Sequence, residues 1–93
     1  MPKYVIERKI PNAGQMNQQE LRTISQQSNG VLREMTQNGS NVQWLHSYVV
    51  DDGIYCVYIA PDPEAVREHA RCGGFPADKV SEVRSMIDPV TGE

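Results

Sequence analysis

The chain has 93 residues and 39% of them are hydrophobic, which is typical of one small globular domain rather than a disordered segment. The net charge is −3, and the nine Lys and Arg residues are scattered along the chain. Nucleic-acid binding requires clustered positive charge, so this composition argues against a nucleic-acid partner. No apolar run is long enough to span a bilayer and no charged-then-apolar leader is present, which argues against a membrane partner.

The only thiols are those of Cys56 and Cys72, whose spacing matches no C-x-x-C metal or redox motif. Two cysteines are also too few for a disulfide framework. We therefore expect a cytoplasmic protein with reduced thiols.

The beginning of the chain predicts a strand followed by a helix. The residues from Lys3 to Arg8 form a β-type run. Asn17 and Glu20 have the spacing of a capping box, which predicts the start of a helix, and Asn38-Gly39 predicts its end. We expect one helix in spite of Gly30 near its middle. The apolar residues of this segment fall on one helical stripe, namely Leu21, Ile24, Val31, Leu32 and Met35.

The segment from Val42 to Ala60 predicts two strands joined by a turn at Asp51-Asp52-Gly53. Which of its side chains share a face of the sheet depends on the register of this hairpin. The segment holds most of the reactive or ligand-capable side chains of the chain, namely Trp44, His46, Tyr48, Tyr55, Cys56 and Tyr58.

Two hairpin registers are compatible with these turn residues. A two-residue turn at Asp52-Gly53 places His46 and Cys56 on opposite faces of the sheet. A three-residue loop from Asp51 to Gly53 places them on the same face, together with Tyr48 and Tyr58. Asp-Gly fits both geometries, so both registers stay open at this point.

The last third of the chain predicts a second helix and a final strand. Asp62 is a suitable cap with Pro63 at the first helical position, and Gly73-Gly74 ends the helix. Lys79 to Ile87 is expected to form the last strand. We assign residues 1–88 to a single domain and residues 89–93 to a polar tail, which is either loose or laid on a partner subunit.

The predicted order is strand, helix, strand, strand, helix, strand. This is the βαββαβ pattern of the ferredoxin-like α+β fold. Right-handed crossovers place the first strand beside the third in an antiparallel sheet, with both helices on one face. The other face stays uncovered, and a second copy of a chain this small is the usual cover. We therefore expect a homodimer formed through the sheets.

Side chains that can bind a metal ion occur on two parts of the predicted fold. Glu7 lies on the first strand, which neighbours the third, and His46 and Cys56 lie in the hairpin. Such a set could bind a divalent transition metal such as nickel, zinc or copper. His69, on the second helix, is a further candidate. All three ring or thiol candidates have an alternative interpretation. His46 and Cys56 could be partly buried packing residues, since free cysteine usually behaves as a small hydrophobe, and His69 could be a core residue on the apolar stripe of its helix.

No sequence pattern assigns a catalytic residue. No serine lies in a G-x-S-x-G context, and spacing alone assigns no Cys-His pair as nucleophile and base. We therefore interpret the chain as a binding protein rather than an enzyme. Two alternatives stay open: a dimerisation module whose aromatic residues only pack the interface, and a small-molecule site or active site. That pocket would lie between sheet and helices or between two sheets, and it would be lined by Trp44, His46, Tyr48 and Tyr58, with His46 as a possible acid or base near pH 7.

The stretch IYCVYIAPDPEAVREHA, the later segment FPADKVSEV and a short opening strand after MPK resemble a family of small bacterial ferredoxin-like proteins. The family was long catalogued as a domain of unknown function, and some members are described as nickel-binding. The similarity runs through most of the chain and is clearest around Cys56, from Ala60 to Val66, at His69 and at Pro76-Ala77-Asp78. It implies a homodimer formed through the sheets, with metal bound by surface histidine and acidic side chains.

The chain departs from the pattern of this family at two places. Many members carry Asp-Val-His at the end of the first strand, where this chain has Ile6-Glu7-Arg8. Many also carry a second histidine after the equivalent of His69, where this chain has Gly73. The leading hypothesis is a dimeric protein that sequesters or buffers nickel or a similar divalent ion. Its first candidate ligands are His46, His69 and Glu7, and Cys56 is a candidate of lower rank.

Overall fold

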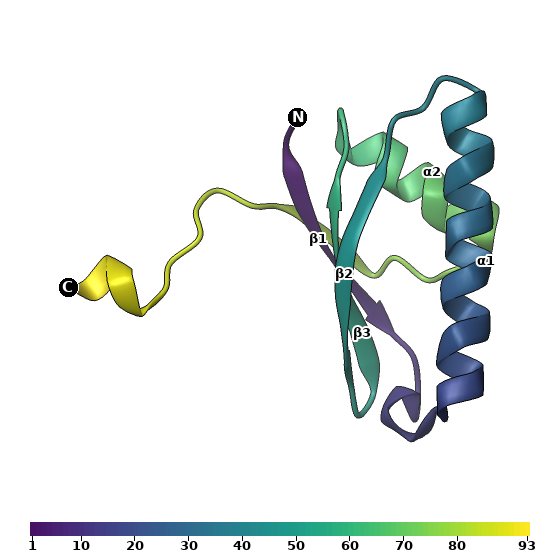
Figure 1. Ribbon diagram of the computed structural model, residues 1–93, viewed down its shortest axis with the longest axis horizontal. Coiled ribbons are helices and arrows are strands. Elements are labelled where there is room, and N and C mark those ends of the chain that lie inside the picture. The colour runs from purple at the N-terminus through teal and green to yellow at the C-terminus, as the bar shows by residue number, and fades with distance from the viewer.

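The computed structural model describes all residues, 1–93, and confirms the predicted βαββαβ order of a ferredoxin-like α+β domain (Figure 1). Two short 3₁₀ helices lie outside this pattern, at Ala13–Gln15 and Pro89–Gly92. The main elements in chain order are β1 (Lys3–Lys9), α1 (Gln18–Gln37), β2 (Gln43–Val50), β3 (Gly53–Ile59), α2 (Pro63–Gly73) and β4 (Lys79–Glu82).

The four strands form one antiparallel sheet in the order β2-β3-β1-β4, and both helices cover the same face of it (Figure 1). The other side is called the open face below. Side chains of β1 alternate between the two sides. Tyr4, Ile6 and Arg8 point toward the helices and are buried, whereas Val5 and Glu7 lie on the open face and are half-buried.

Helix α1 begins and ends where the sequence predicts. The carboxamide oxygen of Asn17 accepts a hydrogen bond from the backbone N–H of Glu20 at 2.8 Å, and the Glu20 carboxylate accepts one from the backbone N–H of Asn17 at 3.1 Å. This capping box satisfies two N–H groups that have no partner inside the helix. The helix continues through Gly30 and ends at Asn38, followed by Gly39 with a φ of 91°.

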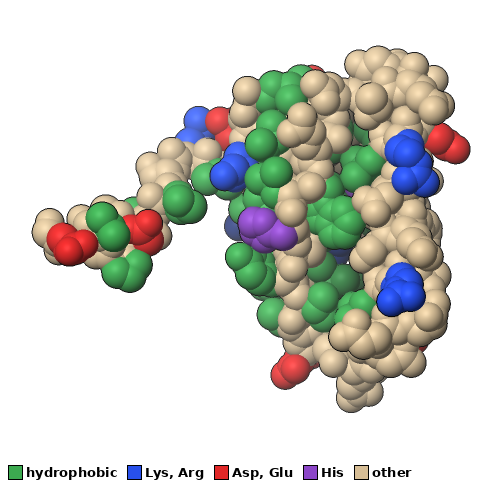
Figure 2. Space-filling model, in the orientation of Figure 1, with side chains coloured by type: hydrophobic (Ala, Val, Ile, Leu, Met, Phe, Trp, Pro, Cys, Tyr) green, Lys and Arg blue, Asp and Glu red, His purple; other side chains and the backbone are tan.

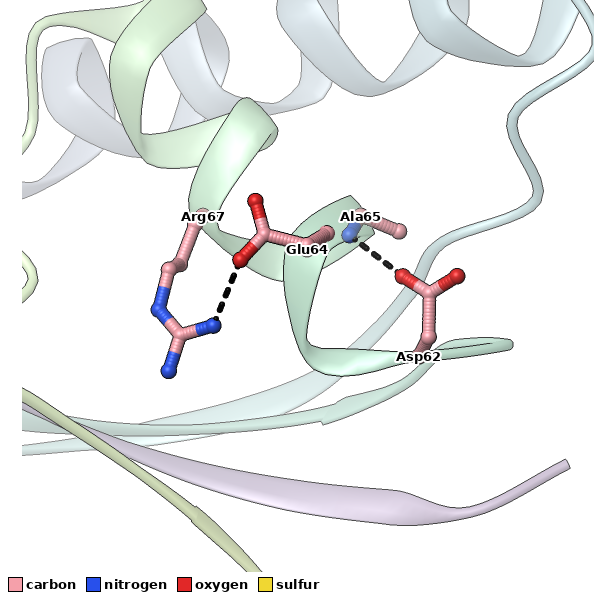
Figure 3. Close-up of polar contacts among 4 residues, drawn as sticks. All are labelled: Asp62, Glu64, Ala65 and Arg67. Atoms are coloured by element: carbon pink, nitrogen blue, oxygen red, sulfur yellow. Dashed lines mark hydrogen bonds and ion pairs between the residues drawn. The ribbon is translucent and has the colours of Figure 1, made fainter.

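Helix α2 also has the predicted start and end. The Asp62 carboxylate accepts a hydrogen bond from the backbone N–H of Ala65 at 2.8 Å, and Arg67 pairs with Glu64 one turn into the helix at the same distance (Figure 3). Gly74 ends the helix in the left-handed conformation, with a φ of 71°. The apolar side of α2 meets the sheet, where Val66 is fully buried.

The hairpin turn differs from both predicted turns. Val50 pairs with Gly53, so the turn residues are Asp51 and Asp52, and Gly53 belongs to β3. The neighbouring strand explains this shift, because a β-carbon on Gly53 would lie 2.7 Å from the carbonyl oxygen of Arg8. Only glycine permits this close approach of β1 to β3. The turn itself is held by the β1–α1 connection, since the carbonyls of Asp51 and Asp52 accept backbone hydrogen bonds from it.

A β-bulge at Leu45 changes the direction of the side chains before it. Trp44 pairs with Tyr58, whereas His46 pairs with Val57, so one residue of β2 is left over between the two pairs. Trp44 therefore faces the helices, while His46 lies on the open face. Without the bulge these two side chains would lie on the same side of the strand, because they are two residues apart.

The last strand is shorter than predicted. The expected strand from Lys79 to Ile87 ends at Glu82 in the structure. The neighbouring strand β1 starts at Lys3. The carbonyl of Lys3 accepts the last backbone hydrogen bond between the two strands, from the N–H of Val83. A longer β4 would therefore have no strand to pair with. Residues 84–93, called the C-terminal arm below, leave the sheet and extend away on the side opposite α1 (Figure 1).

The core lies between the helices and the sheet. Among the main elements, β1, α1, β3 and α2 contribute buried hydrophobic side chains, which include Tyr4, Ile6, Met35, Ile54, Tyr58 and Val66, whereas β2 and β4 contribute none.

No helix has both the length and the hydropathy that crossing a membrane would require.

Candidate functional site

The four side chains expected to bind metal lie on two opposite sides of the sheet. Glu7 and His46 lie on the open face. Cys56 and His69 are buried on the helix-covered side. Within one subunit, no three His, Cys, Asp or Glu side chains are close enough together to hold a metal ion. The structure therefore does not gather the four candidates into one site.

The open face carries two rows of paired side chains near its centre. In the first row, Tyr48 of β2 pairs with Tyr55 of β3, which in turn pairs with Glu7 of β1. In the second row, His46 pairs with Val57. The imidazole of His46 packs edge-to-face against the ring of Tyr48, with ring centres 5.1 Å apart and an interplanar angle of 74°.

Glu7 and His46 are not adjacent ligands on the open face, because β3 lies between the strands that carry them. These two side chains have no third His, Cys, Asp or Glu close enough to complete a metal-binding group within one chain. An ion held at this face would need further ligands from a second chain.

Large apolar side chains are unusually exposed on the open face. Tyr48 is 62% exposed, Val50 45% and Tyr55 41%. Figure 2 shows hydrophobic side chains gathered over the sheet, with a histidine among them. Such a surface is typical of a site that meets a partner.

The helix-covered side contains a buried arginine. Arg8 is only 5% exposed and forms no salt bridge. Its Nε donates to the Sγ of Cys56 at 3.4 Å, one Nη donates to the hydroxyl of Tyr58 at 3.2 Å, and the other donates to the carbonyl of Pro76. The guanidinium also lies 5.5 Å from the ring centre of Phe75, within the range of a cation–π contact.

His69 is fully buried beside this arginine. Its Nε2 atom shares a hydrogen bond of 3.2 Å with the hydroxyl of Ser28, while its Nδ1 atom has no partner. The ring packs between Tyr58 and Phe75, at centre distances of 5.2 and 5.6 Å. Burial, and next the charge of Arg8, lowers the pKa of His69 to about 4, so the imidazole is neutral near pH 7.

The electrostatics of this interior do not suit a cation. Burial raises the pKa of Tyr58, and the nearby Cys56 raises it further, so the phenol keeps its proton at neutral pH. Arg8 is the one permanent charge there, and it contacts Cys56 directly. A divalent metal at Cys56 or His69 would lie beside this positive charge, so the interior residues do not fit a metal ion.

A partly enclosed cavity of about 80 Å³ lies between α1 and the helix-covered side of the sheet. Two of the four residues expected to line a small-molecule pocket, Trp44 and Tyr58, line this cavity. The other two, His46 and Tyr48, lie on the open face and do not line it. Further lining residues come from α1 and β1, among them Leu21, Ile24, Ser28 and Arg8.

Arg8 is the feature of this interior that the sequence interpretation missed. The signal was present, because Arg8 follows Tyr4 and Ile6 at every second position of the first strand. A strand whose first two such residues are buried predicts that the third faces inward as well.

A family model described as nickel responsive protein SCO4226-like matches residues 4–83. The crystal structure of SCO4226 from Streptomyces coelicolor A3(2) is similar, with a TM-score of 0.74 and 20% sequence identity. The similarity covers 91% of this chain and 99% of that chain. A search of curated proteins found no match. Since the family model spans most of the chain, the protein belongs to the SCO4226-like family of nickel responsive proteins.

Proposed function

We propose that the protein binds a divalent transition metal, with nickel as the first ion to test, at the open face between two copies of the chain. The proposed role is sequestration or buffering of that ion. Membership of a family described as nickel responsive supports the choice of nickel. The observation that carries the location is that His46, the one exposed histidine, lies on the uncovered face of the sheet, as Glu7 does.

The side chains of this face have the right chemistry for such an ion. Imidazole nitrogen and carboxylate oxygen are donors that nickel, zinc and copper accept in proteins. One subunit supplies only one of each here. A two-fold contact between open faces repeats every side chain, so two His46 and two Glu7 side chains become available.

The open face and the C-terminal arm both support a second copy as the cover of the sheet. Tyr48, Val50 and Tyr55 expose apolar surface that such a contact would bury. Met86 and Ile87 on the arm are each 79% exposed and extend from the same side of the sheet. Apolar residues on an extended segment are stabilised when they pack on another chain.

The test is calorimetric titration of tag-free protein with Ni²⁺ near pH 7.5, with zinc and copper as parallel titrations. His46→Ala and Glu7→Gln should each weaken binding by at least about tenfold, because each removes a metal bond in both copies. Glu34→Gln changes an exposed carboxylate on α1 and should leave binding unchanged. Sedimentation velocity should give a dimer in the presence of the ion.

Several outcomes would contradict the proposal. Absence of heat with all three ions would rule out metal binding by the wild-type protein. Retained affinity in His46→Ala would place the ion elsewhere. Loss of affinity in His69→Gln, with the fold intact by circular dichroism, would move the site to the interior.

A further inference from the structure

The interior of the domain holds a positive charge without a negative partner. Arg8 is more than nine-tenths buried, and the two salt bridges of the structure, Arg67–Glu64 and Arg84–Glu82, lie on the surface far from it in sequence. Its hydrogen-bond acceptors are a thiol, a phenol hydroxyl and a main-chain carbonyl. Buried charges in proteins are normally paired, because desolvation of an unpaired ion is costly.

The buried guanidinium lines a cavity and has donors to spare. An arginine carries five N–H donors, and three acceptors are present around Arg8. The same guanidinium belongs to the wall of the cavity between α1 and the sheet. Contacts with Tyr58 and Phe75 hold it in place, so its position does not depend on a ligand. The cavity therefore has one fixed positive end.

The rest of the cavity wall is largely apolar. Leu21 and Ile24 face it from α1, and Trp44, Val49 and Ile54 face it from the hairpin. A ligand that fits both parts has one negative group and a short hydrocarbon body. A planar carboxylate suits a single guanidinium better than a phosphate dianion, whose second charge would find no cation among the lining residues.

We propose that this cavity binds a small aliphatic monocarboxylate, with its carboxylate on Arg8 and its alkyl chain against Leu21, Ile24 and Trp44. The cavity volume of about 80 Å³ is roughly half that of an engineered cavity that holds benzene, which limits the chain to a few carbons. The carboxylate neutralises the charge of Arg8, and the alkyl chain of the ligand fills the space lined by apolar side chains. This site lies on the opposite side of the sheet from the proposed metal site and does not depend on it.

The experiment follows Trp44 fluorescence and the melting temperature of the full tag-free chain during titration with butyrate. Butyramide serves as the neutral isostere, and sodium chloride and inorganic phosphate serve as controls for ionic strength and for anions in general. Butyrate should raise the melting temperature and bind at least about tenfold more tightly than butyramide, since a charge-assisted pair is worth that much or more. A melting temperature that rises equally with butyrate and butyramide, or equally with butyrate and phosphate, would overturn the proposal.

Two variants locate the ligand within the domain. Arg8→Met removes the charge and should reduce butyrate affinity by at least about tenfold, whereas Arg22→Met changes an exposed arginine on α1 and should not. Ile24→Phe fills the cavity, leaves Arg8 in place and should also abolish binding, so the test survives if Arg8→Met fails to fold. Unchanged butyrate affinity in Ile24→Phe, or in a folded Arg8→Met, would show that the carboxylate binds elsewhere.

Discussion

The hydroxyl of Ser28 and the Nε2 atom of His69 lie 3.2 Å apart and connect α1 to α2 inside the domain. Ser28 occupies the gap in the apolar stripe of α1, so this small polar residue leaves room for an imidazole from the other helix. The second ring nitrogen of His69 has no partner and is surrounded by Tyr58 and Phe75. A proton added to this ring would therefore introduce a second positive charge next to Arg8.

This arrangement predicts a loss of stability in mild acid. The pKa of His69 is about 4 in the folded protein and about 6.5 in the unfolded chain, so the unfolded state takes up the proton first as the pH falls. The full stability is present above pH 6.5 and decreases between pH 6.5 and 4, by roughly 3 kcal/mol in total. Urea unfolding at several pH values measures this change.

A His69→Gln variant separates this effect from the titration of carboxylates in the same range. Glutamine can still bond to the hydroxyl of Ser28 but carries no charge at any pH. The difference in unfolding free energy between wild type and variant should therefore narrow as the pH falls from 6.5 to 4. A constant difference across that range would contradict the depressed pKa.

Two glycines in helices should respond in opposite ways to alanine. A β-carbon on Gly73 would lie 2.3 Å from the ring of Phe75, whereas one on Gly30 would meet nothing closer than 4.0 Å. Gly30→Ala should stabilise the domain by up to about 1 kcal/mol through helix propensity. Gly73→Ala should destabilise it by about 1–3 kcal/mol, because Phe75 must leave its place against His69. Thermal and urea unfolding of both variants measure the two changes, and stabilisation by Gly73→Ala would contradict the packing of Phe75.

The start of α1 offers a third stability test. Asn17→Ala removes the side-chain acceptor for the backbone N–H of Glu20 and should cost about 1 kcal/mol. Asn38→Ala is the matched change at the other end of the helix, where the side chain makes no hydrogen bond, and should cost less. Equal losses of urea-unfolding free energy would mean that the capping box contributes nothing specific.

Local sequence signals were sufficient for the fold but not for the arrangement of the candidate site. Caps such as Asn17 and Asp62 and the apolar stripe of α1 act within a few residues, so they can be recognised without a structure. The place of the hairpin turn depends on contact between Gly53 and β1, which lies more than forty residues earlier. The observed two-residue turn puts His46 and Cys56 on opposite faces, whereas a turn longer by one residue would put them on the same face.

The bulge at Leu45 and the buried Arg8 illustrate the same limit. No turn residue or glycine marks the bulge, yet it decides that Trp44 lines the cavity while His46 faces outward. The alternation of inward-facing and outward-facing residues in the first strand predicts that Arg8 points inward. The lack of a carboxylate beside Arg8 depends on how the other elements pack around it, which no local sequence pattern records.

The C-terminal arm provides a test of the proposed dimer that does not involve metal. Met86, Ile87 and Val90 are between 70% and 79% exposed, and their packing on a second copy would stabilise the dimer. Deletion of residues 84–93 should raise the dissociation constant of the dimer by at least about tenfold, since burial of even one such side chain is worth more than 1.4 kcal/mol. Sedimentation equilibrium over a range of concentrations measures this constant.

The deletion should leave the fold of each subunit unchanged, because the arm leaves the sheet after Val83 and extends away from the body of the domain. Glu93→Gln is the matched control, since it alters the end of the arm without removing apolar surface. The combined substitution of Met86 and Ile87 by serine should weaken the dimer almost as much as the deletion, because these two residues carry most of the exposed apolar surface of the arm.

A wild-type protein that stays monomeric at every concentration, with and without Ni²⁺, would refute the dimer itself. A dimer of unchanged affinity after the deletion would instead assign the contact to Tyr48, Val50 and Tyr55 on the open face alone.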